Sequence, residues 1–255
     1  MRELLNQKSL PEILNVYESI IGDFVCELNS DPIKNKQKIL EVCHVGKFLM
    51  LLGNQTRIDQ LSEKPDFIIN VDGDKVGLEH QIIIDQKSKE REGFFENIFA
   101  VVESELKIDP ELPNFLANCY LNSDLDFRLS DKANFIQEAK TVVKQYILNG
   151  VLLPNSLIRR ISSMPHSQKT ISLNFGAWWQ KAITPDVIVS AVLSKESKIL
   201  TYKKNSGEKQ WLLLVIGSLK NSSYEVEQDL IFELDTKFDK VYLLEDFRAR
   251  LFDLK

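Results

Sequence analysis

The sequence is poor in several features that would identify a protein class directly. It contains three cysteines in 255 residues, Cys26, Cys43 and Cys119, which lie far apart and form no CxxC pair. An odd number of scattered cysteines predicts neither a disulfide framework nor a zinc site. We therefore interpret them as small buried apolar residues. GxSxG, GxGxxG, HExxH and P-loop motifs are also absent, which disfavours the enzyme classes that depend on them.

Long hydrophobic runs are missing as well. The longest, "FLMLL" at 48–52 and "WLLLVIG" at 211–217, are far shorter than the ~20 residues that a membrane helix needs. The opening residues "MRELLNQKSL" lack the apolar core of a signal peptide. We expect a cytoplasmic protein with no membrane association.

The chain has no excess of positive charge. It carries 32 Lys and Arg against 37 Asp and Glu, a net charge of −5, which argues against broad, non-specific adhesion to nucleic acid. Any contact with phosphates must come from local basic patches. Trp178 and Trp179 could stack on bases, or could pack in a core or dimer contact. The basic candidates are Lys87, Lys89, Arg91, Lys195 and Lys198.

No linker rich in proline, glycine or serine divides the chain, and no repeat occurs. Hydrophobic residues make up 44% of the sequence, enough to fill a sizeable core. Helical and strand patterns alternate throughout, which predicts one α/β domain over 1–255, with a mixed sheet flanked by helices. Helices are predicted at 10–29, 33–52, 88–108, 131–148, 184–204 and 222–235, and strands in the segment 64–85, at 112–121, within 150–176, at 210–218 and at 239–246.

Two of the helix starts are predicted from capping signals. Thr184 is a helix N-cap followed by Pro185 at the first helical position. Ser222 and Glu225 have the spacing of a capping box. These signals predict that one helix begins at Thr184 and another at Ser222.

The segment "KPDFIINVDGDKVGLEHQIIID" at 64–85 predicts a β-hairpin. Its turn is either Asp72-Gly73, which pairs residues whose numbers sum to 145, or Gly73-Asp74, with a sum of 147. Both registers put Asp66, Glu79 and Gln81 on one face, whereas a three-residue loop would send Glu79 to the apolar side. The apolar face collects Phe67, Ile69, Val71, Val76, Leu78, His80, Ile82 and Ile84.

The two acids of the hairpin predict a cation site. Opposed residues of an antiparallel pair have Cβ atoms ~5 Å apart, so two ionised carboxylates repel unless a proton or cation lies between them. Mg²⁺ typically takes one or two carboxylates in proteins and keeps several waters. In the structural alternative, Asp66 caps the strand entry after Pro65 and Glu79 is a solvated strand residue.

"PD" at 65–66 followed by "EHQ" at 79–81 resembles the PD-(D/E)xK nuclease superfamily. The resemblance implies a restriction-endonuclease-like core at 33–121, built from a helix, three antiparallel strands, a helix and a strand, with 122–255 as a C-terminal α/β extension of the same sheet. It also implies that Asp66 and Glu79 bind Mg²⁺ or Mn²⁺, together with a main-chain carbonyl near His80. Glu41 on the preceding helix is a further carboxylate candidate.

The chain departs from this family at the motif lysine, whose position is occupied by Gln81. Similar proteins recruit a lysine from the following helix, and Lys87 or Lys89 could serve here, with Lys87 as the catalytic candidate. An amide can orient an attacking water but cannot take its proton. The resemblance therefore implies slow or conditional cleavage.

The function implied by the resemblance is a metal-dependent endonuclease, with DNA favoured over RNA, in restriction, repair or phage defence. A homodimer or a regulatory partner protein could restrain it. The alternative is a catalytically inactive nucleic-acid or protein binding module, which Gln81 favours. A third hypothesis, an unrelated α/β interaction protein, requires the two acids to lie apart.

Overall fold

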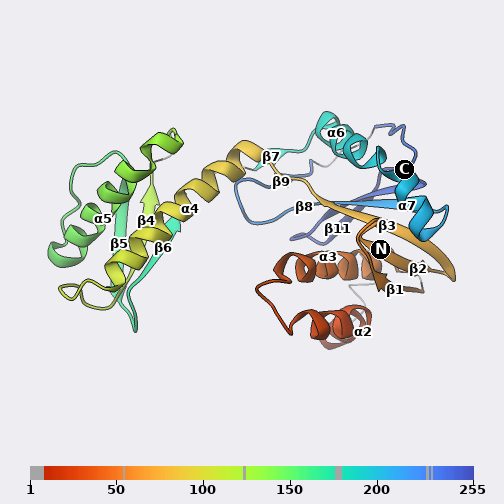
Figure 1. Ribbon diagram of the computed structural model, residues 1–255, viewed down its shortest axis with the longest axis horizontal. Coiled ribbons are helices and arrows are strands. Elements are labelled where there is room, and N and C mark those ends of the chain that lie inside the picture. Colours follow the sequence, from red (N-terminus) through yellow and green to blue (C-terminus); the bar gives the residue numbers. More distant parts are fainter. Residues whose placement is uncertain (1–8, 54, 123–124, 176–179, 228–229, 231) are drawn as a thin grey trace. The chain divides into compact units, whose positions relative to one another are not determined.

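The computed structural model describes residues 9–53, 55–122, 125–175, 180–227, 230 and 232–255 (Figure 1). The chain divides into two compact units. Unit 1 consists of Met1–Ile84 and Gln180–Lys255, and unit 2 consists of Asp85–Trp179. Unit 2 is therefore inserted into the sequence of unit 1. This division differs from the single domain predicted over 1–255, and no composition shift or linker marks it.

Unit 1 is built on a six-stranded mixed sheet with the order β1-β2-β3-β8-β10-β11. The first three strands form an antiparallel meander, β3, β8 and β10 run parallel, and β11 returns antiparallel along β10. The prediction of a mixed sheet flanked by helices is confirmed. The strands are β1 (Thr56–Leu61), β2 (Phe67–Val71), β3 (Asp74–Ile82), β8 (Gln210–Ile216), β10 (Lys240–Glu245) and β11 (Arg250–Asp253).

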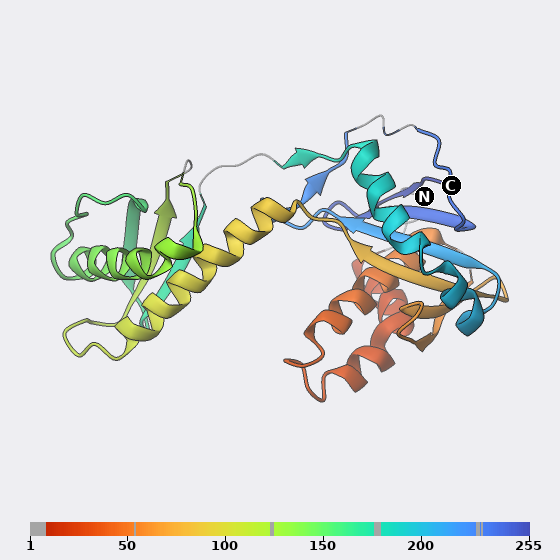
Figure 2. The ribbon, with the colours of Figure 1, turned by 45° about the horizontal axis from the view of Figure 1, so that its top comes forward.

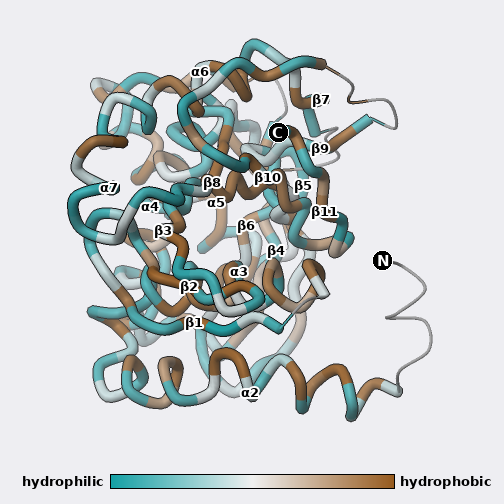
Figure 3. The backbone as a smooth tube through the Cα atoms, turned by 90° about the vertical axis from the view of Figure 1, so that its right-hand side faces the viewer, coloured by the Kyte–Doolittle hydropathy of each residue, from teal (hydrophilic) through white to brown (hydrophobic). Residues whose placement is uncertain are grey.

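Helices cover both faces of this sheet. The helices α2 (Leu10–Leu28) and α3 (Lys36–Leu52) lie on one face, and α6 (Pro185–Glu196) and α7 (Ile199–Ser206) lie on the other (Figure 1). The central strands β8 and β10 are strongly hydrophobic (Figure 3). A strand needs this continuous apolar pattern when both of its faces are buried.

The predicted hairpin is formed by β2 and β3, with its turn at Asp72-Gly73. Both turn residues have positive φ, 54° at Asp72 and 91° at Gly73, as the tight hairpin turn requires. Val71 pairs with Asp74 and Phe67 with Leu78, so the register with a sum of 145 is confirmed. The apolar face packs against α2 and α3 through Phe67, Ile69, Val71, Val76 and Leu78.

Unit 2 contains a three-stranded sheet with the order β5-β4-β6. The helices α4 (Gln86–Lys107) and α5 (Lys132–Asn149) pack on one side of it (Figure 2). A short 3₁₀ turn, η1 (Leu129–Asp131), precedes α5. The strands are β4 (Phe115–Leu121), β5 (Ile158–Pro165) and β6 (Thr170–Asn174).

The sheet of unit 2 corrects the predicted domain plan. The strand predicted at 112–121 is β4, which pairs with β5 and β6 and not with the hairpin. The prediction that the strand at 112–121 shares the sheet of the hairpin is therefore wrong, whereas β8, β10 and β11, from the segment 122–255, do extend that sheet. A strand's sequence pattern reports its burial but not its partner, because pairing across distant segments is a tertiary property.

Two helix predictions also need correction. The helix predicted at 184–204 is divided into α6 and α7. The helix predicted at 222–235 is wrong, because Tyr224–Glu225 forms strand β9 beside β7 (Lys181–Ala182), and the described residues from 222 to 235 contain no helix. Ser223 Oγ accepts hydrogen bonds from the N–H groups of Gly217 (2.9 Å) and Ser218 (3.0 Å). Ser223 thus closes the loop after β8.

The cysteine prediction is confirmed only in part. Cys119 is buried, whereas Cys26 is exposed and Cys43 is half-buried. In the part of the chain that the structure describes, no helix combines the length and apolar character needed to cross a bilayer.

Candidate functional site

The two acids of the hairpin lie at the end opposite its turn. Asp66 directly precedes β2, and Glu79 lies on β3. The last pair of the register is Phe67 with Leu78, and Asp66 and Glu79 are the next residue on either side and interact electrostatically. The main-chain N–H of His80 donates to Asp66 Oδ2 over 2.9 Å. The hypothesis that requires the two acids to lie apart therefore loses support.

The electrostatics of Asp66 reflect this neighbour. Burial, followed by the negative charge of Glu79, raises the pKa of Asp66 to about 6. The hydrogen bond from His80 and the positive charge of Lys38 act in the opposite direction. Asp66 therefore holds a proton in mildly acidic solution and is ionised at neutral pH.

Lys195 supplies the positive charge that faces Glu79. Its Nζ lies 2.6 Å from Glu79 Oε1, and the side chains are 20% and 5% exposed. The lysine comes from α6, which covers this face of the sheet. The sequence predicted Lys195 only as a nucleic-acid contact. The helical spacing of Lys195, Ile199 and Tyr202 indicates that they share a face, and Ile199 and Tyr202 are buried. This spacing is the sequence signal that Lys195 points toward the core.

Three buried oxygens around this ion pair make no well-formed hydrogen bond among the described residues. They are Glu79 Oε2, Gln81 Oε1 and the hydroxyl of Tyr202. Burial, and then the nearby charge of Glu79, raise the pKa of the Tyr202 hydroxyl, so it stays protonated. The hydroxyl of Tyr202 faces Glu79 as a donor, since a hydrogen bond to that carboxylate also raises its pKa. Because unpaired buried acceptors are uncommon in proteins, Gln81 Oε1 is the oxygen of this group that indicates room for a cation or a donor.

The third carboxylate candidate, Glu41, has a different partner. It pairs with Lys38 Nζ at 3.1 Å, and Lys38 also reaches the main-chain oxygens of Ser62 and Asp66, each at 3.4 Å. Among the described residues, no group of three His, Cys, Asp or Glu side chains could hold a metal ion. The predicted set of Asp66, Glu79 and Glu41 is therefore not formed as a three-carboxylate site.

The opposite side of β3 holds a histidine pair that the sequence did not predict. His80 Nε2 lies 3.1 Å from Nδ1 of His44 on α3, and both side chains are buried. Burial lowers the pKa of each ring. The hairpin pattern predicts His80 on the apolar face, but its partner could be found only by placing α3 against β3.

The remaining basic candidates are distributed over both units. Lys87, Lys89 and Arg91 lie on α4 in unit 2, and the exposed Lys198 directly precedes α7 in unit 1. Arg91 is held within unit 2, where its guanidinium lies over the rings of Phe95 (5.5 Å) and Phe175 (5.6 Å). The catalytic role of Lys87 stays a prediction. Trp178 and Trp179 lie outside the described residues.

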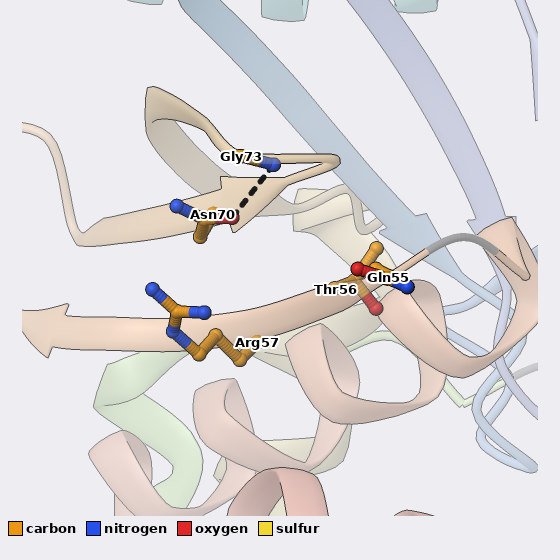
Figure 4. Close-up of a pocket in the computed structure, with 5 residues that line it drawn as sticks. All are labelled: Gln55, Thr56, Arg57, Asn70 and Gly73. Carbon is orange, nitrogen blue, oxygen red and sulfur yellow. Dashed lines mark hydrogen bonds between the residues drawn. The ribbon is translucent and has the colours of Figure 1, made fainter.

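A separate open pocket of about 440 Å³ lies near the turn of the hairpin (Figure 4). Asn70 Oδ1 accepts a hydrogen bond from the N–H of Gly73 over 3.1 Å, which stabilises the turn. Asp66 and Glu79 are at the other end of the hairpin, so this pocket is not their site. Its lining residues are Gln55, Thr56, Arg57, Asn70 and Gly73.

The site therefore combines two carboxylates, one amide, one lysine and one tyrosine, all from unit 1. Lys195 balances the charge of one carboxylate, and the second ionised carboxylate favours binding of a cation or a cationic group over binding of a neutral ligand.

Comparison of the chain with protein-family models, with curated proteins and with solved structures found no match.

Proposed function

We propose that this protein is a metal-dependent nuclease that hydrolyses phosphodiester bonds of nucleic acid. The observation that carries the proposal is the convergence of Asp66 and Glu79, with Lys195 held 2.6 Å from Glu79. Carboxylates that share a partly buried site beside a lysine are the groups that phosphoryl-transfer chemistry uses.

The order of elements supports the resemblance to the PD-(D/E)xK superfamily. Helix α3 and the antiparallel strands β1, β2 and β3 match the first half of that core. The second helix and strand are represented by α6 with α7 and by β8, which runs parallel to β3. Unit 2 is inserted between the two halves. The match thus involves elements outside the predicted range of 33–121, and Lys195 and Glu79, which meet in the site, are 116 residues apart in the sequence.

The residues of the site fit a small divalent cation. Gln81 Oε1 is a buried oxygen without a hydrogen-bond partner in the described part of the chain, and the carboxylates of Asp66 and Glu79 are close enough to interact electrostatically. Mg²⁺ accepts one or two carboxylates and completes its shell with water and substrate phosphate. Asp66, Glu79 and Gln81 would hold the ion, with DNA as the favoured substrate and Mn²⁺ as a substitute metal.

Each side chain of the site would have a different role in hydrolysis. Above pH 6, Asp66 joins Glu79 in the ionised form, which provides the negative charge that a cation needs. Lys195 stabilises negative charge at the Glu79 end and can donate to a phosphate oxygen. Gln81 can orient a water molecule but cannot remove its proton. When bound, a divalent ion would lower the pKa of a coordinated water molecule and neutralise negative charge on the phosphate.

A second candidate function is a catalytically inactive binding module. The same ion pair favours it, because Lys195 already neutralises Glu79 without any metal. Gln81, which replaces the lysine of the family motif, points in the same direction. The two functions differ in their requirement for metal.

The two functions can be separated by a cleavage assay on labelled duplex DNA, single-stranded DNA, RNA and supercoiled plasmid, with Mg²⁺, Mn²⁺ or EDTA. Asp66→Asn and Lys195→Met are expected to abolish metal-dependent cleavage. Asp74→Asn is the matched control, because Asp74 lies on the same hairpin, is 64% exposed and pairs with Lys209.

Mn²⁺ binding by calorimetry completes the test. Wild-type protein and Asp74→Asn should bind the ion, and Asp66→Asn should bind it at least ten-fold more weakly. No cleavage and no metal binding by the wild-type protein would rule out the nuclease and leave the binding module. Cleavage that persists in Asp66→Asn would place the active site elsewhere.

A further inference from the structure

The sheet of unit 2 has one face that its helices leave uncovered. Along β4, residues alternate between buried and half-buried. The buried set, with Ala117 and Cys119, packs against α4 and α5. The alternate set is Leu116, Asn118 and Tyr120, which belong to none of the core clusters of the described residues. This alternation places them on the open face.

The strand register assigns the other residues of this face, which form three rows with one residue from each strand. Tyr120 pairs with Arg160 of β5 and with Asn174 of β6, and the next rows follow two residues apart. On the flanking strands, Arg160, Ser162 and Ser172 are exposed, and Met164 is 54% exposed. We call these residues the open sheet face: Leu116, Asn118, Tyr120, Arg160, Ser162, Met164, Thr170, Ser172 and Asn174.

The open sheet face is mostly polar and contains no acidic side chain. Arg160 places its guanidinium 4.1 Å from the centre of the Tyr120 ring, so the two planar groups are held together. Asn118, Ser162 and Ser172 offer hydrogen-bond donors and acceptors in the next row. Leu116 and Met164 form an apolar end. Arg160 is the one charged residue among the nine.

Three acids of unit 2 pair with lysines of α5. Glu105 on α4 pairs with Lys140 of α5 at 2.7 Å. Asp109, after α4, pairs with Lys144 at 2.6 Å, and so does Glu111. The helix side therefore carries ion pairs, whereas the open sheet face presents Arg160 alone, with the exposed Arg159 beside it in the irregular stretch of β5.

From these observations, we infer that the open sheet face of unit 2 binds single-stranded nucleic acid. Bases stack on tyrosine rings and on guanidinium planes, and their exposed edges are read by Asn and Ser side chains. An uncovered sheet with a positive charge and no acid complements a phosphate backbone. A duplex would present stacked, paired bases that a flat sheet cannot reach. The inference rests on the proposed function for the class of ligand, but not on the acids of unit 1.

The test is fluorescence anisotropy of the full-length protein in EDTA, so that no cleavage occurs, with labelled single strands of about 12 nucleotides. DNA and RNA strands are measured separately, and a duplex serves as competitor. Tyr120→Ala should weaken binding by about ten-fold, since each stacked base contributes roughly that factor or more. Arg160→Ser should weaken it and lower the salt dependence by about 0.7 of an ion.

Two variants provide the controls. Tyr120→Phe keeps the ring and should bind like the wild-type protein. Arg128→Ser removes an exposed arginine of unit 2 that lies before α5 rather than on the sheet, and it should leave binding unchanged. Thermal unfolding verifies that each variant is folded. If Tyr120→Ala does not fold, Tyr120→Trp replaces it. Stacking of a base on the new tryptophan is then measured as quenching of its fluorescence.

The outcomes distinguish this inference from the nuclease proposal. Loss of binding in Tyr120→Ala and Arg160→Ser, but not in Arg128→Ser, would support the open sheet face. Equal binding by all variants, absence of binding by the wild-type protein, or competition by duplex as strong as by single strands would each overturn it. None of these results depends on cleavage, which the Asp66→Asn assay tests separately.

Discussion

The two sheets of this protein differ in how completely they are covered. The sheet of unit 1 has helices on both faces, and the sheet of unit 2 has them on one. In unit 1 the central strands β8 and β10 are mostly apolar, and the few buried polar side chains of β3 include Glu79 on one face and His80 on the other. In unit 2 polar residues alternate with apolar ones along β4. The comparison teaches that a polar residue in a covered sheet suggests chemistry, whereas a polar row on an open sheet suggests a binding surface.

The largest expected effects test whether the two units are separate. Leu78 of unit 1 and Phe95 of unit 2 are fully buried in different clusters. Leu78→Ala and Phe95→Ala should each cost about 3–5 kcal/mol of unfolding free energy, because each leaves a cavity in a packed core. Calorimetry should show two transitions, with each variant lowering one of them. A single transition lowered equally by both variants would contradict the division.

The next effect concerns the covered ion pair of unit 1. Lys195→Met leaves Glu79 buried without its partner and should cost about 3 kcal/mol. The double variant Lys195→Met/Glu79→Gln should recover most of that loss, as measured by denaturant unfolding. Lys203→Met is the control, because Lys203 pairs with the 86%-exposed Glu208 and should cost less than about 1 kcal/mol. Equal losses for both lysines would mean that Lys195 acts as a surface residue.

A smaller effect is expected from the pH dependence of Asp66. Burial and Glu79 raise its pKa from 3.8 to about 6 in the folded state. Between these values the folded protein binds more protons than the unfolded chain, so the unfolding free energy falls as the pH rises. Asp66→Asn should therefore match the wild-type stability below pH 4 and exceed it by about 1–3 kcal/mol above pH 6.

Urea unfolding at pH 4, 6 and 8 measures this difference. Asparagine keeps an oxygen that can accept from the His80 N–H, so the substitution removes the charge and retains the hydrogen bond. Mg²⁺ should reduce the advantage of Asp66→Asn at pH 8 by stabilising the wild-type protein. Lower stability of Asp66→Asn at pH 8 without metal would show that the carboxylate charge is satisfied by its neighbours.

The smallest expected effect is on the open face of unit 2. Met164→Ala removes a side chain that is 54% exposed and should change the unfolding free energy by no more than about 0.5 kcal/mol. Ile161→Ala on the same strand, which is 4% exposed and faces the helices, should cost about 2–4 kcal/mol. A large loss for Met164→Ala would show that this face is covered in solution.

The local features of the hairpin could be predicted from the sequence. Alternating residues and Asp72-Gly73 were sufficient to predict β2, β3 and the common face of Asp66, Glu79 and Gln81, because strand period and turn chemistry act over a few residues. The apolar run at 210–218 was likewise sufficient to predict a buried strand. Local signals failed at Ser222 and Glu225, where the spacing of a capping box occurs in a loop whose Ser223 binds the two residues that follow β8.

The tertiary structure decided which distant segments meet. Parallel pairing of β3 with β8 spans the whole of unit 2, and no local pattern encodes a partner at that distance. This pairing brings α6 over β3, so that Lys195 reaches Glu79. It also makes β4 part of a separate sheet with an open face. The sequence by itself determined where the carboxylates lie on the hairpin, and the fold determined their charged partner, because an ion pair depends on proximity in space and not on spacing along the chain.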